Sequence, residues 1–348
     1  MTTSPKSGAG RLAGRIAGTY PLAETYHLAA LEAEMVGLSD TVAALVPEAT
    51  GLELPGNPST VVIGRTEWVE RNVASFSHLI EPVRQHLEER VADSGPGAKS
   101  AAAMTSRVMQ AEMTAVLGVL ARRVLGQYEL VLPTGEDGDV VAFVGPNIMQ
   151  MERTHQFRPS EFRFWVTLHE MTHRAQFQGI PWLREYFMGL VSELVEQSVP
   201  EPGRLNRMME EITSRRESGG SLLDERGLLG LFATSSQRAI IDKVQALMSL
   251  LEGHGHVVMD RLGHEHLKSQ ERMSRVLKNR KLDKRTAAFF RITGLEMKLN
   301  QYRMGEQFIK TVEREAGWDT VKLAFRGVGS LPTLEEIEAP SRWLQRVA

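Results

Sequence analysis

Residues 164–178 read FWVTLHEMTHRAQFQ, a mostly apolar run that contains two histidines four residues apart. Apolar or small side chains surround this pair, as is typical of a helix that lies largely in a protein core. We expect Ser160 to cap the helix at its N-terminus, with Glu161 in the first turn. Gly179 and Pro181 should end it. The stretch therefore predicts a buried helix with two imidazoles on one face.

The five residues from His169 to His173 form the pattern HExxH. Side chains four residues apart on a helix are neighbours, so His169 and His173 can bind one metal ion. In peptidases with this motif the metal is zinc, which lowers the pKa of a water molecule to about 7, and the Glu accepts the proton of that water. The motif predicts Zn²⁺, with His169 and His173 as ligands and Glu170 as general base.

A third zinc ligand is expected, since catalytic zinc usually has three protein ligands and one open position. Gly179 stands where the metzincin motif would need a further histidine, which excludes that class. The best segment is RAIIDKVQALMSLLEGHGHVVMDRL, residues 238–262, whose apolar stripe has Glu252 at its edge. A charged residue there needs a partner, and a metal would serve. Glu252 is therefore the preferred third ligand.

Other polar residues of this segment stay open as alternatives. His256 and Asp260 continue the helical line from Glu252 at four-residue spacing, whereas His254 points elsewhere. His256 is a rival ligand or a group that could stabilise an oxyanion, and His254 is a further alternative ligand. Asp260 could orient a ligand histidine through its second ring nitrogen. Gly253 and Gly255 weaken a helix, so they either allow close approach to the HExxH helix or mark a helix end.

The rest of the chain is mostly helical in pattern, with one small β region. Residues YELVLP (128–133) and DVVAFVG (139–145) flank the turn TGEDG and predict a hairpin. The fold class expected is mainly α with a small β-sheet, α+β. Hydrophobic periodicity predicts helices over 21–46, 66–91 (with a kink or break at Pro82) and 101–125, and a mostly helical C-terminal third. Glycine and proline residues predict a loop over 47–60.

Three parts are expected along the chain. Residues 1–10 are small and polar and predict a disordered tail, residues 11–125 a helical N-terminal half, and residues 126–348 the catalytic region. The last two can also form one continuous domain. At 348 residues the chain is long enough for either arrangement.

Composition excludes several classes of site and partner. Cysteine is absent, which excludes disulfides, Cys-ligated zinc, iron–sulfur clusters and a thiol nucleophile. Lys plus Arg is 41 and Asp plus Glu is 43, a formal net charge of −2 that argues against broad attraction to nucleic acid or an anionic membrane. We find no export signal and no apolar run long enough to span a membrane, so we expect a cytoplasmic protein.

The segments FWVTLHEMTHRAQF, LLEGHGHVVMD and GLEMKLNQYRMGEQF resemble a family of zincin-like, zinc-dependent metallopeptidases of actinobacterial type. Some of its members carry a label that associates them with coenzyme F420 biosynthesis. The resemblance runs from about Leu12 to Trp343 and implies a zincin-like fold, in which a second helix supplies a Glu to the metal. It implies His169, His173 and Glu252 as ligands and Glu170 as catalytic base.

The leading prediction is a zinc-dependent hydrolase, most simply a metallopeptidase, acting on a peptide or a small amide. Glu170 would deprotonate the attacking water and pass the proton to the leaving amine. Two alternatives remain. One is a zincin without peptidase activity, whose zinc is structural and whose helical half is a binding or regulatory module. The other is a small-molecule amidohydrolase.

Overall fold

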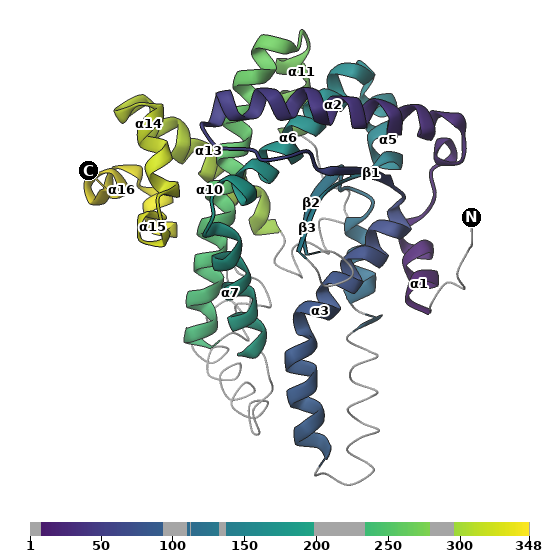
Figure 1. Cartoon of the computed structure of the whole chain (residues 1–348), viewed down its shortest axis with the longest axis horizontal. Coiled ribbons are helices and arrows are strands. Elements are labelled where there is room, and N and C mark those ends of the chain that lie inside the picture. The colour runs from purple at the N-terminus through teal and green to yellow at the C-terminus, as the bar shows by residue number, and fades with distance from the viewer. Residues whose placement is uncertain are drawn as a thin grey trace, which may run out of the picture. The chain divides into compact units, whose positions relative to one another are not determined.

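Figure 1 shows the computed structural model of the chain, which describes residues 8–92, 110–111, 113–131, 137–197, 234–278 and 296–347. Within these ranges the protein is mainly helical with one small sheet, which confirms the predicted fold class. The helices are α1 (Gly8–Ala17), α2 (Tyr26–Thr50), α3 (Arg65–Ala92), α5 (Gly145–His155), α6 (Pro159–Gly179), α7 (Leu183–Glu196), α10 (Ser235–His266), α11 (Gln270–Lys278), α13 (Glu296–Ala316), α14 (Trp318–Val321), α15 (Leu334–Glu338) and α16 (Pro340–Val347). Short 3-10 turns cover Pro21–Glu24, Lys322–Phe325 and Val328–Ser330.

The sheet has three strands in the order β1-β3-β2. The predicted hairpin is confirmed, because β2 (Gly126–Val131) pairs antiparallel with β3 (Asp137–Val144). Residues 132–136 of its predicted turn lie outside the described residues. β1 (Ser59–Ile63) pairs parallel with β3 and was not predicted, since its first two residues were assigned to a loop. Its five residues are too short for a clear pattern, and the strand depends on its pairing with β3.

Two helices differ from their predicted form. α2 continues beyond residue 46 with Pro47 inside it, and it ends where Gly51, at φ 70°, adopts the left-handed conformation and donates its N–H to the Pro47 carbonyl. Proline is tolerated there because only one backbone hydrogen bond is lost near the helix end. α3 continues through Pro82, which excludes the predicted break, and the alternative of a kink stays a prediction. Of the tail predicted over residues 1–10, residues 1–7 lie outside the described part, and α1 begins at Gly8.

The chain forms two compact units. The first comprises residues 1–181 and 258–279, and the second comprises residues 182–257 and 280–348. α10 contributes to both, since its residues up to Val257 belong to the second unit and those from Val258 onward to the first. The predicted division into 11–125 and 126–348 stays a prediction.

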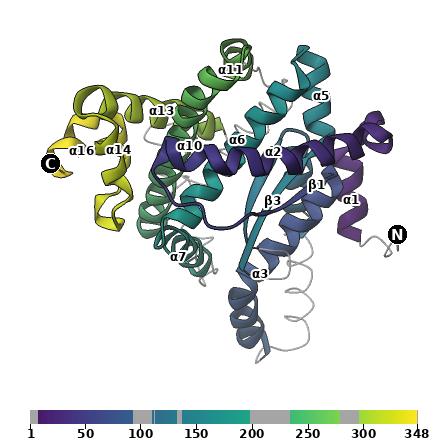
Figure 2. The same ribbon diagram turned by 45° about the horizontal axis from the view of Figure 1, so that its top comes forward.

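In the first unit the sheet lies between two helical layers (Figures 1 and 2). On one face α1, α3 and the helical residues 113–120 enclose a fully apolar cluster that includes Trp68, Ala142 and Val144. On the other face α6 packs against β2, where the Phe177 and Tyr128 rings lie 6.3 Å apart. This packing places the helix that carries HExxH directly against the edge strand β2.

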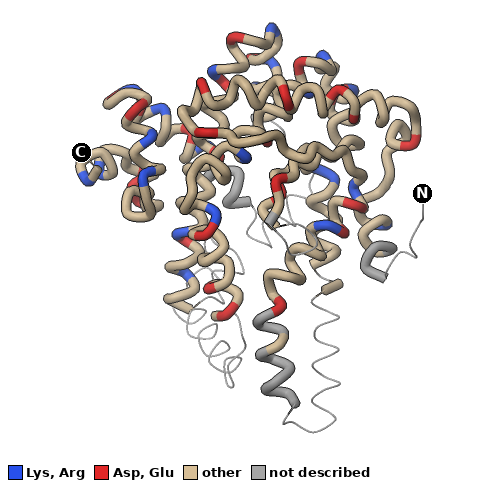
Figure 3. The backbone as a smooth tube through the Cα atoms, viewed as in Figure 1, with Lys and Arg blue, Asp and Glu red and all other residues tan. Residues whose placement is uncertain are grey.

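Acidic and basic residues are interspersed along the described helices of both units (Figure 3). This distribution accords with the formal net charge of −2. None of the helices in the described ranges combines the length and apolar character that a membrane span requires.

Candidate metal centre

α6 holds the HExxH residues and begins two residues earlier than a cap at Ser160 would predict. Its N-cap is Arg158, without a side-chain cap, and Pro159 occupies the first position, where its fixed φ suits a helix. The prediction of Ser160 as N-cap is therefore wrong. Glu161 lies in the first turn as predicted, and its Oε2 accepts hydrogen bonds from the backbone N–H of Ser269 at 2.8 Å and from the Ser269 hydroxyl. α6 ends at Gly179, as predicted.

The two histidines of the motif lie side by side on α6. Their ring centroids are 4.6 Å apart and the planes are close to perpendicular, at 84°. Both rings are half-buried, whereas their neighbours Leu168, Met171 and Thr172 are fully enclosed. One helix thus presents two imidazoles on a rigid support, as the four-residue spacing predicts.

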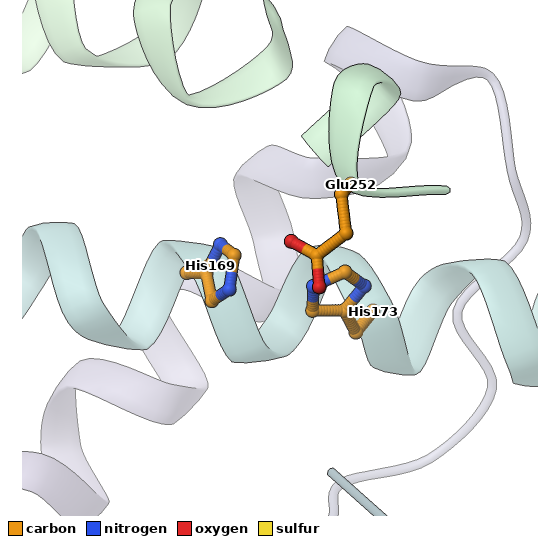
Figure 4. A group of neighbouring side chains, drawn as sticks. All are labelled: His169, His173 and Glu252. Carbon is orange, nitrogen blue, oxygen red and sulfur yellow. The ribbon is translucent and has the colours of Figure 1, made fainter. Parts of the chain in front are cut away.

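Glu252 completes a group of three side chains that could hold a metal ion (Figure 4). One ligand atom from each of His169, His173 and Glu252 lies within 4.8 Å of the others, and each residue is half-buried. Within the described ranges, no other group of histidine and carboxylate side chains meets this condition. The group contains neither His254 nor His256, so the geometry favours Glu252 over both alternative ligands.

The donor set fits zinc in type and spacing. Two imidazole nitrogens and one carboxylate oxygen are a known ligand set of catalytic zinc. Ligand atoms on a tetrahedral zinc ion lie about 3.4 Å apart, given bonds of about 2.1 Å. The ligand atoms of the three side chains lie within 4.8 Å of one another. Small side-chain rotations would reduce these distances to the separation that zinc requires. With three protein ligands, one position would remain for water or substrate.

Glu170 lies on α6 beside the first histidine, but its carboxylate is directed at the sheet. The residue is 5% exposed and packs over Gly126, the first residue of β2. A Cβ atom at residue 126 would lie 2.6 Å from the Glu170 Cγ and 2.8 Å from both Cδ and Oε1. The absence of a side chain at residue 126 thus gives the Glu170 carboxylate its space, a role that the sequence pattern did not indicate.

α10 carries Glu252 and is continuous through Gly253 and Gly255, so these glycines do not mark a helix end. Gly253 does allow a close approach, but the expectation that it faces the HExxH helix is wrong. A Cβ there would overlap the Gly305 carbonyl of α13 and lie 2.6 Å from the Glu306 backbone nitrogen. Two glycines thus let α10 and α13 touch through their backbones next to Glu252.

The three other polar residues singled out on α10 have separate environments. His254 is buried, and its ring stacks on Trp318 at 5.5 Å and meets Phe325 in an edge contact at 5.2 Å. His256 Nδ1 lies 3.6 Å from Oε2 of Glu306, a residue of α13 that the sequence analysis missed. Asp260 Oδ1 accepts a hydrogen bond from Gln270 Nε2 at 3.2 Å. Their predicted roles toward a ligand or an oxyanion stay predictions.

The fold and the His–His–Glu group together define a metallohydrolase-like protein of the zincin class. The family described as zincin-like metallopeptidase matches residues 7–344, and the chain belongs to that family. The chain is also similar to a crystal structure from Chloroflexus aurantiacus, described as a candidate hydrolase with a novel fold. The two share 30% sequence identity over 97% of this chain and 96% of the other, with a TM-score of 0.69. A comparison with curated proteins gives no match.

Proposed function

We propose that this protein is a zinc-dependent metallopeptidase in which His169, His173 and Glu252 hold the ion. The convergence of three ligand atoms within 4.8 Å carries the proposal. Bound zinc would supply an acidified water and polarise the carbonyl under attack.

The catalytic role proposed for Glu170 is proton transfer. Its carboxylate accepts the proton of the attacking water and then delivers it to the leaving amine. Burial against the Gly126 backbone removes competing solvent from the carboxylate and limits its movement. A base held in one position is what general base catalysis requires.

The sheet supports a peptide as substrate over a small amide. β2 stands at the end of the described sheet, and its first residue touches Glu170. An extended peptide that added to β2 by main-chain hydrogen bonds would bring its backbone next to this base. We propose a cytoplasmic enzyme without nucleic-acid or membrane partners, in accord with the lack of cysteine and the net charge of −2. The actinobacterial type and the association with coenzyme F420 stay predictions.

Glu170→Gln tests the proposal, because it keeps the shape of the side chain and removes its basicity. We expect wild-type zinc content by elemental analysis, and a loss of about 10²- to 10⁴-fold in cleavage of a pool of fluorogenic peptides. Glu185→Gln is the matched control, since Glu185 is exposed on α7.

Unchanged peptide cleavage in Glu170→Gln would remove this residue from the mechanism. Zinc with four protein ligands and no peptide cleavage by the wild type would favour a structural zinc in a binding module. Cleavage of small amides without cleavage of peptides would favour an amidohydrolase.

A further inference from the structure

The ring of His169 has an unusual neighbour on its Nδ1 side. The Sδ atom of Met259 lies 3.2 Å from this nitrogen. Met259 is 1% exposed and lies on α10, in the part of that helix that belongs to the same unit as α6. The contact is therefore enclosed and joins two helices of one compact unit.

The chemistry of the thioether determines where the imidazole proton is. A methionine sulfur has no hydrogen and can only accept, so a hydrogen bond across this contact requires the proton of a neutral His169 ring to lie on Nδ1. The lone pair is then on Nε2, the atom that would bind the metal. Gln176, three residues after His173, acts in the same way, with its Oε1 2.9 Å from the His173 Nδ1.

We propose that Met259 is a positioning residue that holds His169 in the tautomer and orientation required for zinc binding, an inference that rests on the proposed zinc site. Histidine ligands of zinc usually donate their second N–H to a carboxylate, a backbone carbonyl or water. A thioether is a weaker acceptor than any of these. The Met259 sulfur therefore increases the electron density of the His169 ring less than the Gln176 amide oxygen increases that of the His173 ring.

Met259→Leu tests this role, because leucine conserves the volume and removes the acceptor. We expect zinc affinity, measured by competition with a chelator, to fall by about tenfold, at the lower end of the range for residues that support a ligand. Met273→Leu is the control, since Met273 is fully buried on α11 of the same unit. It should lose similar packing and keep its zinc affinity.

A second measurement needs no metal. The ¹⁵N chemical shifts of the His169 ring in the metal-free wild type should report a proton on Nδ1, and Met259→Leu should show a mixture of tautomers. Met259→Gln, which returns an acceptor, should restore the Nδ1-protonated form and the zinc affinity.

The two possible failures are distinguishable. If Met259→Leu and Met273→Leu bind zinc equally well and the His169 tautomer does not change, the role of Met259 is wrong and the zinc site stands. If the wild type itself binds no zinc, the proposed function fails, and the tautomer measurement still decides the role of Met259.

Discussion

The Glu170 carboxylate has its space because Gly126, 44 positions earlier in the sequence, has no side chain. Glu170 fills the volume that a side chain at Gly126 would occupy, with Cγ, Cδ and Oε1 all within 2.8 Å of the position of a Cβ atom. The carboxylate packs against the backbone of β2 at Gly126. If residue 126 had a Cβ atom, Glu170 and not the strand would have to move. Even a single methyl group at residue 126 would therefore displace the proposed base, Glu170.

Gly126→Ala should therefore reduce activity while the fold and the metal ligands persist. A displacement of about 1 Å of a catalytic group can cost about 10²-fold in rate, and we expect a loss of kcat of that order. Zinc content should stay at the wild-type level. Gly189→Ala on α7 is the control, because a Cβ there meets nothing within 4 Å. Wild-type kcat in Gly126→Ala would show that the Glu170 carboxylate needs no such space.

The residues of the candidate site could be predicted from sequence only where the pattern of their own helix carries the signal. His169, Glu170 and His173 follow from spacing, and Gln176 could have been found at three residues from His173 by the same rule. Glu252 was placed by the cost of a charge at the edge of an apolar stripe. Gly126 and Met259 carry no such signal, because their importance arises from contacts with residues 44 and 90 positions away.

At the scale of helices, the crossing of α10 and α13 also could not be predicted from sequence. The sequence indicates that α10 is a helix and that Gly253 serves a close approach, but Gly305 lies 52 residues further on and nothing local pairs the two. The structure brings them together so closely that a Cβ at Gly305 would overlap the Ser249 carbonyl oxygen and lie 2.6 Å from the carbonyl carbon. Such contact requires glycine at this point of both helices.

Gly305→Ala should consequently be strongly destabilising. The added methyl group meets main chain, which has no alternative rotamer, so we expect a loss of at least about 3 kcal/mol in the free energy of unfolding, above the usual cost of overpacking. Urea denaturation measures it. Gly37→Ala within α2, where a Cβ meets nothing, should instead be neutral or slightly stabilising because alanine favours a helix. Equal stability of the two variants would contradict this helix contact.

At the scale of the whole molecule, composition and periodicity were sufficient for the mainly helical class and the hairpin. They were not sufficient for β1, whose five residues form a strand only by pairing with β3, about 80 residues later. They also did not indicate that one strand of the sheet carries a buried charged residue. Glu129 of β2 is 2% exposed and faces Arg71 of α3, whose Nη1 lies 3.0 Å from Oε2. Burial raises the pKa of Glu129, although Arg71 acts in the opposite direction.

This raised pKa gives the stability of the protein a defined dependence on pH. A folded-state pKa above the unfolded value means that the folded protein binds the proton more tightly. The contribution of Glu129 is then fully present below the unfolded pKa of about 4.3, and it is lost as pH rises through the folded pKa. Glu129→Gln does not titrate and has nearly the same shape. The difference in unfolding free energy, wild type minus variant, should therefore fall with rising pH, by about 1.4 kcal/mol for each unit between the two pKa values. Denaturation of both proteins across this pH range measures it, and a difference that grows with pH would mean that Arg71 outweighs burial.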